Sequence, residues 1–221
     1  MIVTFDLDDT LYPEEMFVRS GFRAVARALH ERWGTPEDQA FAVMWDSLQA
    51  HGRGTQFDDV VEAFGLRRRQ SVRDLVNTYR HHRPSIALPE ESRQVLEALS
   101  PRPLYVVTDG HKVVQQSKID ALGLRPYLRH AYITHRYGIH HRKPSVHVFE
   151  LLMRREQARP EDVVYIGDDP SKDFRALRPL GVRTVRVTTG RHARVAVPAA
   201  EDAERTVASI SEVPALVEAM E

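Results

Sequence analysis

From Pro84 onward, short β-rich runs alternate with stretches of helical spacing, and this alternation constrains the fold more than any other feature. The β-rich runs cover residues 104–107, 131–134, 163–166 and 182–187, and the apolar residues 1–3 begin the chain in the same manner. Alternating strands and helices predict a parallel sheet with right-handed crossovers. Runs that are apolar on both faces are typical of the central strands of a doubly wound sheet. We therefore expect an α/β fold with a mainly parallel sheet.

The segment between the first two β-rich runs, about residues 15–84, has a helical period throughout. Val18, Phe22, Val25 and Leu29 stand at i, i+4, i+7 and i+11, as on the apolar face of an amphipathic helix. Glycines and prolines separate this stretch from two similar ones. We predict a helical domain at residues 15–84, inserted into a domain made of residues 1–14 and 85–221.

The composition narrows the classes of partner. The 221 residues include 31 basic and 31 acidic side chains, a balance that favours neither nucleic acid nor an anionic membrane. Cysteine is absent, so disulfides and thiolate metal sites are excluded. The N-terminus lacks the pattern of a signal peptide, and no apolar stretch approaches the roughly 18 residues that span a bilayer. We expect a soluble, cytoplasmic protein that acts on a small molecule, as a monomer or homodimer.

Two carboxylates follow the first strand directly. Asp6 and Asp8 stand at i and i+2 in the run 5–10, Phe-Asp-Leu-Asp-Asp-Thr. They should lie at the carboxyl end of a strand, where open α/β sheets bind ligands. Carboxylates gathered at one point attract a hard cation and can serve as nucleophile and as acid or base. The other interpretation is an acidic turn, which the same residues also favour.

Three more polar signals follow in order along the chain. Residues 104–107 lead into Thr108-Asp109-Gly110, Lys143-Pro144 comes next, and residues 163–166 lead into the run 167–173, Gly-Asp-Asp-Pro-Ser-Lys-Asp. With the first run, this ordered set resembles the haloacid dehalogenase superfamily, whose motifs are DxDxT, a Thr or Ser, a Lys and GDxxxxD. The resemblance spans residues 1 to about 190. It implies a Rossmann-like doubly wound core with an all-helical cap domain inserted after the first motif.

The resemblance also implies a reaction and a cofactor. Asp6 would attack phosphorus and form an aspartyl-phosphate. Mg²⁺ would be held by the carboxylates of Asp6 and Asp168 and by the backbone carbonyl of Asp8. A site made of oxygen ligands favours Mg²⁺ over zinc. A carboxyl at Asp8 can protonate a leaving alkoxide and then activate water. Because an expelled halide needs no proton, Asp8 favours a phosphatase over a dehalogenase.

The remaining motif residues would bind the phosphoryl group or support the site. The Thr108 hydroxyl and the Asp109 or Gly110 backbone N–H would bind phosphoryl oxygens, although Thr-Asp-Gly also suits a helix N-cap. Lys143 would pair with Asp6 and the transferring phosphoryl group. Only its place in the order of the motifs indicates this role, because a single lysine before a proline is otherwise typical of the solvated surface. Three other residues would support the site. Asp173 would position Lys143 or a metal-bound water, and Asp169 would be a second metal ligand or a helix N-cap. Thr10 would serve the turn.

The run 135–142, His-Arg-Tyr-Gly-Ile-His-His-Arg, departs from the family, whose members commonly carry acidic residues in its first part. We interpret it as a solvated basic loop rather than a metal site, because its histidines have no fixed helical spacing. The sequence thus predicts Mg²⁺-dependent hydrolysis of a small phosphate monoester, with nucleotide, flavin and sugar monophosphates as candidate substrates. The alternatives are a phosphomutase, a dehalogenase or a non-catalytic protein that binds a phosphometabolite.

Overall fold

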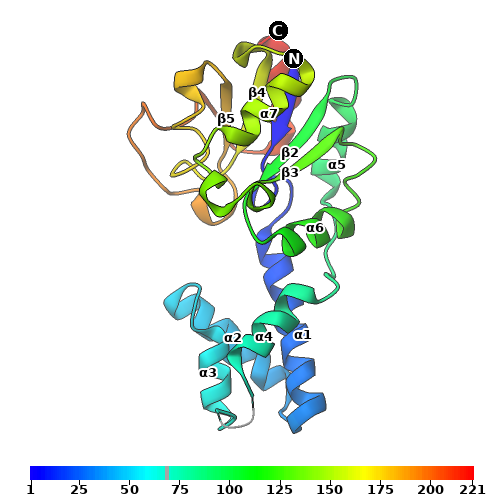
Figure 1. Cartoon of the computed structure of the whole chain (residues 1–221), viewed down its shortest axis with the longest axis vertical. Helices are drawn as coiled ribbons and strands as arrows, with labels where there is room; N and C mark the ends of the chain where they lie inside the picture. Colours follow the sequence, from blue (N-terminus) through cyan, green and yellow to red (C-terminus); the bar gives the residue numbers. More distant parts are fainter. Residues whose placement is uncertain (68–69) are drawn as a thin grey trace. The chain divides into compact units, whose positions relative to one another are not determined.

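The computed structural model describes residues 1–67 and 70–221. The chain divides into two compact units, one made of Met1–Glu14 with Ala87–Glu221 and the other of Glu15–Ile86. Figure 1 traces the chain through both units. No helix among the described residues is both long and apolar enough to cross a membrane.

The first unit contains a six-stranded, wholly parallel sheet in the order β3-β2-β1-β4-β5-β6. The strands are β1 (Ile2–Phe5), β2 (Leu104–Thr108), β3 (His130–Ile133), β4 (Val163–Gly167), β5 (Arg183–Val187) and β6 (Arg205–Val207). The doubly wound α/β fold predicted from the sequence is confirmed. Thr134 was expected to end β3, but it begins a 3₁₀ turn instead. Strand β6 was not expected, since its three residues include two exposed ones and make no apolar run.

Four α-helices accompany the sheet: α5 (Glu90–Ala98), α6 (Lys112–Ala121), α7 (His147–Glu156) and α8 (Val213–Ala219). The connection from β4 to β5 contains turns and a 3₁₀ helix, Arg178–Leu180, in place of an α-helix. The other 3₁₀ helices are Thr134–Arg136, Ile139–His141, Pro160–Asp162, Gly190–His192 and Ile210–Glu212. Val148, Phe149 and Leu152 of α7 form one core cluster with buried residues of β2 and β4.

The second unit is helical, with α1 (Glu14–Trp33), α2 (Glu37–His51), α3 (Gln56–Ala63) and α4 (Val72–His81). The apolar face expected on the first helix is buried, because Val18, Phe22, Val25 and Leu29 all belong to the core of this unit. Met44 of α2 and Leu75 of α4 are buried in the same core.

The sheet order places the candidate site. Strand β1 pairs with β2 on one side and with β4 on the other, so chain connections leave in opposite directions from this point. In open α/β sheets, ligands bind at the carboxyl ends of the strands beside such a reversal. The register sets Phe5 opposite Ile166, and the Asp6 N–H donates to the Ile166 carbonyl at 2.8 Å. Asp6 and Asp168 therefore leave neighbouring strands at the same edge.

Candidate active site

Three buried carboxylates meet at the ends of β1 and β4. Asp6, Asp168 and Asp173 each offer an oxygen within 4.8 Å of the others. Their exposed fractions are 4%, 2% and 2%. Among the described residues they are the only group of three or more acidic or histidine side chains arranged to hold a metal ion. Such a concentration of buried negative charge is unfavourable unless cations compensate it.

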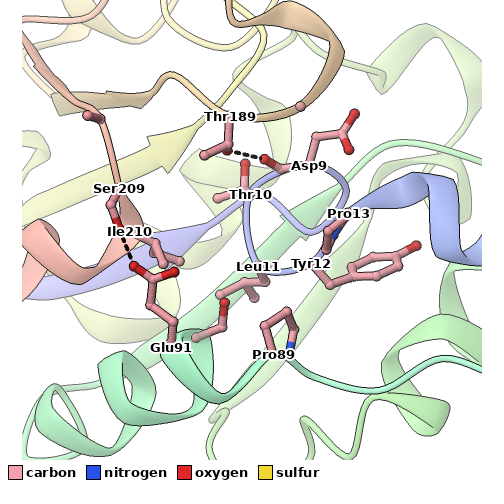
Figure 2. A pocket seen from close by; sticks show the side chains of 13 residues that line it. Asp9, Thr10, Leu11, Tyr12, Pro13, Pro89, Glu91, Thr189, Ser209 and Ile210 are labelled. Carbon is pink, nitrogen blue, oxygen red and sulfur yellow. Dashed lines mark hydrogen bonds between the residues drawn. The ribbon is translucent and has the colours of Figure 1, made fainter.

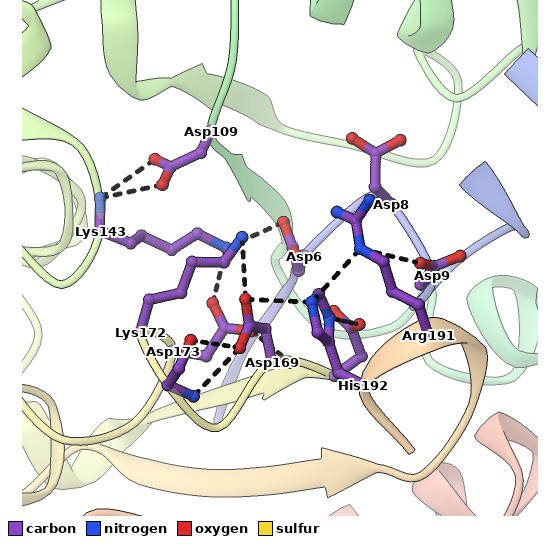
Figure 3. Close-up of polar contacts among 12 residues, drawn as sticks. Asp6, Asp8, Asp9, Asp109, Lys143, Asp169, Lys172, Asp173, Arg191 and His192 are labelled. Carbon is purple, nitrogen blue, oxygen red and sulfur yellow. Dashed lines mark hydrogen bonds and ion pairs between the residues drawn. The ribbon is translucent and has the colours of Figure 1, made fainter. Parts of the chain in front are cut away.

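Lys143 supplies one compensating charge. Its buried ammonium lies 3.0 Å from Asp6 Oδ1 and 2.7 Å from Asp173 Oδ1, as Figure 3 shows. The same nitrogen donates to the Tyr165 hydroxyl at 2.8 Å, and that hydroxyl lies 3.2 Å from Asp173 Oδ1. Burial alone would lower the pKa of Lys143, but Asp173 and Asp6 raise it well above its ordinary value. The side chain is therefore a fixed positive charge at neutral pH.

One lysine does not balance the cluster. Burial raises the pKa of Asp6 from 3.8 to about 6, although Lys143 favours its charged form. Burial raises the pKa of Asp168 further, to about 9, and the neighbouring Asp6 and Asp173 carboxylates add to the effect. Both pKa values are raised, which means that the positive charge near the cluster does not compensate its buried negative charge.

The uncompensated negative charge and the available oxygen atoms show whether Mg²⁺ fits the site. The donors are carboxylate oxygens, which Mg²⁺ prefers. Both Asp173 oxygens already have partners, since Oδ1 contacts Lys143 and Oδ2 accepts the Asp169 N–H at 3.0 Å. Asp6 and Asp168 each have a contact at one oxygen, Oδ1 with Lys143 and Oδ2 with His192. A divalent cation therefore suits Asp6 and Asp168 as ligands, with Asp173 as the residue that holds Lys143.

Asp8 lies beside this cluster in a separate set of contacts. Its Oδ1 accepts from the Tyr12 hydroxyl at 2.6 Å and from Lys118 Nζ at 2.7 Å. Its Oδ2 accepts from Gln115 Nε2 at 2.9 Å. Gln115 Nε2 is also 2.6 Å from the Thr108 hydroxyl. The side chain of Asp8 is thus fixed by protein donors, which leaves its backbone carbonyl for the metal role that the resemblance implied.

The residues after β2 support the site in two ways. The Thr108 hydroxyl is buried at the end of the strand, and Gly110 has φ +137°, where a side chain would be strained. The Asp109 carboxylate accepts the Lys143 backbone N–H at 3.1 Å and the Thr134 hydroxyl at 2.5 Å. The side chain of Asp109 therefore anchors the loop that carries Lys143, a role that sequence reasoning did not assign.

The loop after Asp8 is held from both sides. The Asp9 side chain accepts the Glu14 N–H at 2.9 Å, and the Asp9 carbonyl accepts the Thr189 hydroxyl at 2.7 Å (Figure 2). A Cβ at Gly190 would lie 2.5 Å from Asp9, so only glycine permits this approach. Thr10 lines a cavity of about 270 Å³ next to the loop, and no described residue hydrogen-bonds to its buried hydroxyl. The role of Thr10 in the turn therefore stays a prediction.

Two further side chains, to which sequence reasoning gave no role, lie at the site: His192, from a segment outside the motifs, and Lys172, from the run 167–173. His192, five residues after β5, places Nδ1 2.7 Å from Asp168 Oδ2. Lys172 Nζ lies 3.4 Å from Asp169 Oδ2 (Figure 3). Asp169 Oδ1 accepts both the N–H and the hydroxyl of Ser171, at 3.1 and 2.6 Å, so its side chain closes a turn. His192 could have been sought by the rule that found Asp6, since it too follows a buried strand.

The basic loop at residues 135–142 contributes two of three histidine rings that lie close together. The ring centroids of His140 and His141 lie 4.0 Å apart, and those of His141 and His147 lie 3.8 Å apart. The three rings therefore pack against one another. Arg136 donates to the Gln116 side chain at 2.6 Å. The interpretation of this run as a solvated, partly basic loop stays a prediction.

Comparisons with known proteins identify a family for the chain and several proteins of similar sequence or fold. A family model for haloacid dehalogenase-like hydrolases matches residues 1–181. The chain is 28% identical to a glyceraldehyde 3-phosphate phosphatase of Methanocaldococcus jannaschii over 86% of each chain. It is 28% identical to a phosphoserine phosphatase of Thermus thermophilus, over 74% of this chain and 64% of that one. A 2-haloacid dehalogenase of Pseudomonas syringae shares the fold with a TM-score of 0.68 at 21% identity, over 100% of this chain and 99% of that one.

Proposed function

Because the chain belongs to the haloacid dehalogenase-like hydrolase family, we propose that it hydrolyses a small phosphate monoester in two steps, with Asp6 as the nucleophile and Mg²⁺ as the cofactor. The observation that carries the proposal is the buried cluster of Asp6, Asp168 and Asp173 around Lys143. A phosphate dianion resists attack by a carboxylate unless nearby cations offset the charge of both. Lys143 and a bound divalent cation would supply that offset.

In the first step, an Asp6 oxygen forms a bond to phosphorus while the bond from phosphorus to the alcohol oxygen breaks. Asp8 gives a proton to the departing alkoxide. In the second step, water attacks the phosphorus of the aspartyl-phosphate and gives a proton to Asp8 as the bond to Asp6 breaks. When bound, Mg²⁺ would offset charge on the phosphoryl oxygens. Thr108 and the N–H groups of Asp109 and Gly110 would bind the same oxygens.

Asp8 is the reason for preferring a phosphatase to the other family reactions. A dehalogenase releases halide, which needs no proton, so a carboxyl held beside the nucleophile has no task there. In this chain Asp8 is fixed by Tyr12, Lys118 and Gln115. The relatives found by sequence are named as phosphatases, which supports the same choice. The structural match to a dehalogenase concerns the fold alone.

We further propose that the helical segment 15–84 is a cap domain that sets substrate preference, and that the protein works in the cytoplasm on a soluble metabolite. The substrates in the names of the relatives, glyceraldehyde 3-phosphate and phosphoserine, are short phosphorylated carbon chains. Compounds of this size come first in a substrate panel, with nucleotide, flavin and sugar monophosphates after them.

The test is product analysis on that panel, with Mg²⁺ or with a chelator. We expect inorganic phosphate to be released in the presence of Mg²⁺ and not with the chelator. Transposed phosphate would indicate a phosphomutase, and halide from 2-haloacids with no phosphate release would indicate a dehalogenase. Tight binding of a phosphometabolite without any product would support the non-catalytic alternative.

A further inference from the structure

Lys118 is a buried lysine that lies beside Asp8, outside the acidic cluster. It belongs to α6 and is 2% exposed. Its ammonium lies 2.7 Å from Asp8 Oδ1 and 3.5 Å from Glu14 Oε1. Burying an ammonium costs several kcal/mol unless it gains close partners. The pair with Asp8 is therefore unlike a solvated surface ion pair, which contributes little and holds neither side chain in place.

The contacts treat the two oxygens of Asp8 differently. Each carboxylate oxygen offers about two acceptor positions. On Oδ1 both positions are used, by the Tyr12 hydroxyl at 2.6 Å and by Lys118 at 2.7 Å. Oδ2 has one hydrogen-bond donor among the residues that the structure describes, the amide of Gln115 at 2.9 Å. One position on Oδ2 thus remains for a proton.

The Gln115 amide ties this oxygen to the phosphate end of the site. The same Nε2 atom that contacts Asp8 Oδ2 donates to the Thr108 hydroxyl at 2.6 Å. Gln115 and Lys118 stand at i and i+3 on α6, where side chains share one face of a helix. One helix face therefore fixes the Asp8 carboxylate next to the residue assigned to the phosphoryl group.

We propose that Lys118 is the positioning residue for the proton transfers of Asp8. By occupying Oδ1 together with Tyr12, it leaves Oδ2 as the oxygen that gives a proton to the leaving alkoxide and takes one from the attacking water. The inference rests on the proposed phosphatase reaction. In the first step the Oδ2 proton moves to the alcohol oxygen as its bond to phosphorus breaks, and in the second a water proton moves to Oδ2.

A purely structural role for Lys118 would have a different consequence. If the lysine only stabilised the fold, its loss would slow all substrates alike. If it positions Asp8, its loss will affect substrates according to how much they need a proton on the leaving group. 4-Nitrophenolate leaves without much help, whereas phenolate is more basic and depends on the acid. The two phosphate esters have similar shapes and share the second step.

The experiment measures kcat/KM for phenyl phosphate and 4-nitrophenyl phosphate with Mg²⁺, for the native chain, Lys118→Met and Tyr12→Phe. Lys112→Met is the matched control, because it removes the same charge from an exposed position on the same helix. The thermal midpoint of each variant is recorded. Tyr12→Phe removes only a hydroxyl and tests the inference even if Lys118→Met fails to fold.

We expect Lys118→Met to lose at least ~10-fold more on phenyl phosphate than on 4-nitrophenyl phosphate, within the ~10²–10⁴-fold that general acid–base catalysis provides. Tyr12→Phe should show the same selectivity at a smaller size, and Lys112→Met none. Equal losses on both esters, or no loss, in the folded variants would overturn the inference while leaving the phosphatase intact. If the native chain releases phosphate neither from these esters nor from the substrate panel, the proposed function fails and the inference fails with it.

Discussion

Replacing Asp168 with asparagine should stabilise the metal-free protein, although it removes a proposed Mg²⁺ ligand. Asp168 is buried beside two other carboxylates, and burial with its neighbours raises its pKa from 3.8 to about 9. The folded protein must hold this group protonated over most of the neutral range, or bear its charge without compensation. Asparagine has the same shape, stays neutral and can still accept from His192.

The size of the effect follows from proton linkage. Since the pKa is higher in the folded state, the stability is fully present below the unfolded value of 3.8 and is lost as pH rises toward the folded value of about 9. Within that window each pH unit costs about 1.4 kcal/mol. From about pH 5 to about pH 7, the native chain should therefore lose about 3 kcal/mol that Asp168→Asn does not lose.

Urea unfolding at several pH values with a chelator measures this difference. The matched control is Asp169→Asn. Burial opposes the charged form of Asp169, but Ser171 and Lys172 outweigh it and lower its pKa, so its replacement should leave the slope between about pH 5 and about pH 7 unchanged. Parallel pH profiles for the native chain and Asp168→Asn would refute the reasoning. Added Mg²⁺ should stabilise the native chain and not Asp168→Asn.

The other contacts of the cluster give two further predictions. Lys143→Met leaves Asp6 and Asp173 without their ammonium, so we expect a loss of about 3–5 kcal/mol in urea unfolding at neutral pH and no phosphate release; a stability change below about 1 kcal/mol would contradict this. His192→Ala removes the contact that orients Asp168, so Mg²⁺ affinity measured by calorimetry should fall ~10–100-fold, and an unchanged affinity would show that Asp168 needs no such support.

The positions of Asp6 and Asp168 could be predicted because the ends of buried strands are recognisable in a sequence. Asp6 and Asp168 follow apolar runs directly, and parallel strands bring such positions to one edge. The family resemblance, which the comparisons confirm, added the order of the motifs and a role for Lys143. None of this required knowledge of side-chain contacts.

The supporting residues could not be found in the same way. Lys118 stands 110 residues from Asp8 along the chain, and a lysine within a helix ordinarily belongs to the solvated face. Tyr165 lies in an apolar strand, so the sequence predicts only that it packs in the core. The structure shows that its hydroxyl contacts Lys143. The Asp109 carboxylate anchors the Lys143 loop, a role that comes in addition to the backbone N–H role proposed for this residue. Each role depends on a contact between distant segments that spacing does not encode.

The most direct test of the central claim is to look for phosphate on Asp6 itself. In Asp8→Asn, 4-nitrophenyl phosphate should still phosphorylate the protein, because its leaving group needs no acid, while hydrolysis of the intermediate should slow for want of a base. The account predicts a burst of 4-nitrophenolate approaching one per chain and, by mass spectrometry after acid quench, a phosphoryl group on the peptide at Asp6. A native chain that hydrolyses the ester, with no burst in the variant or with the label on another residue, would contradict the account.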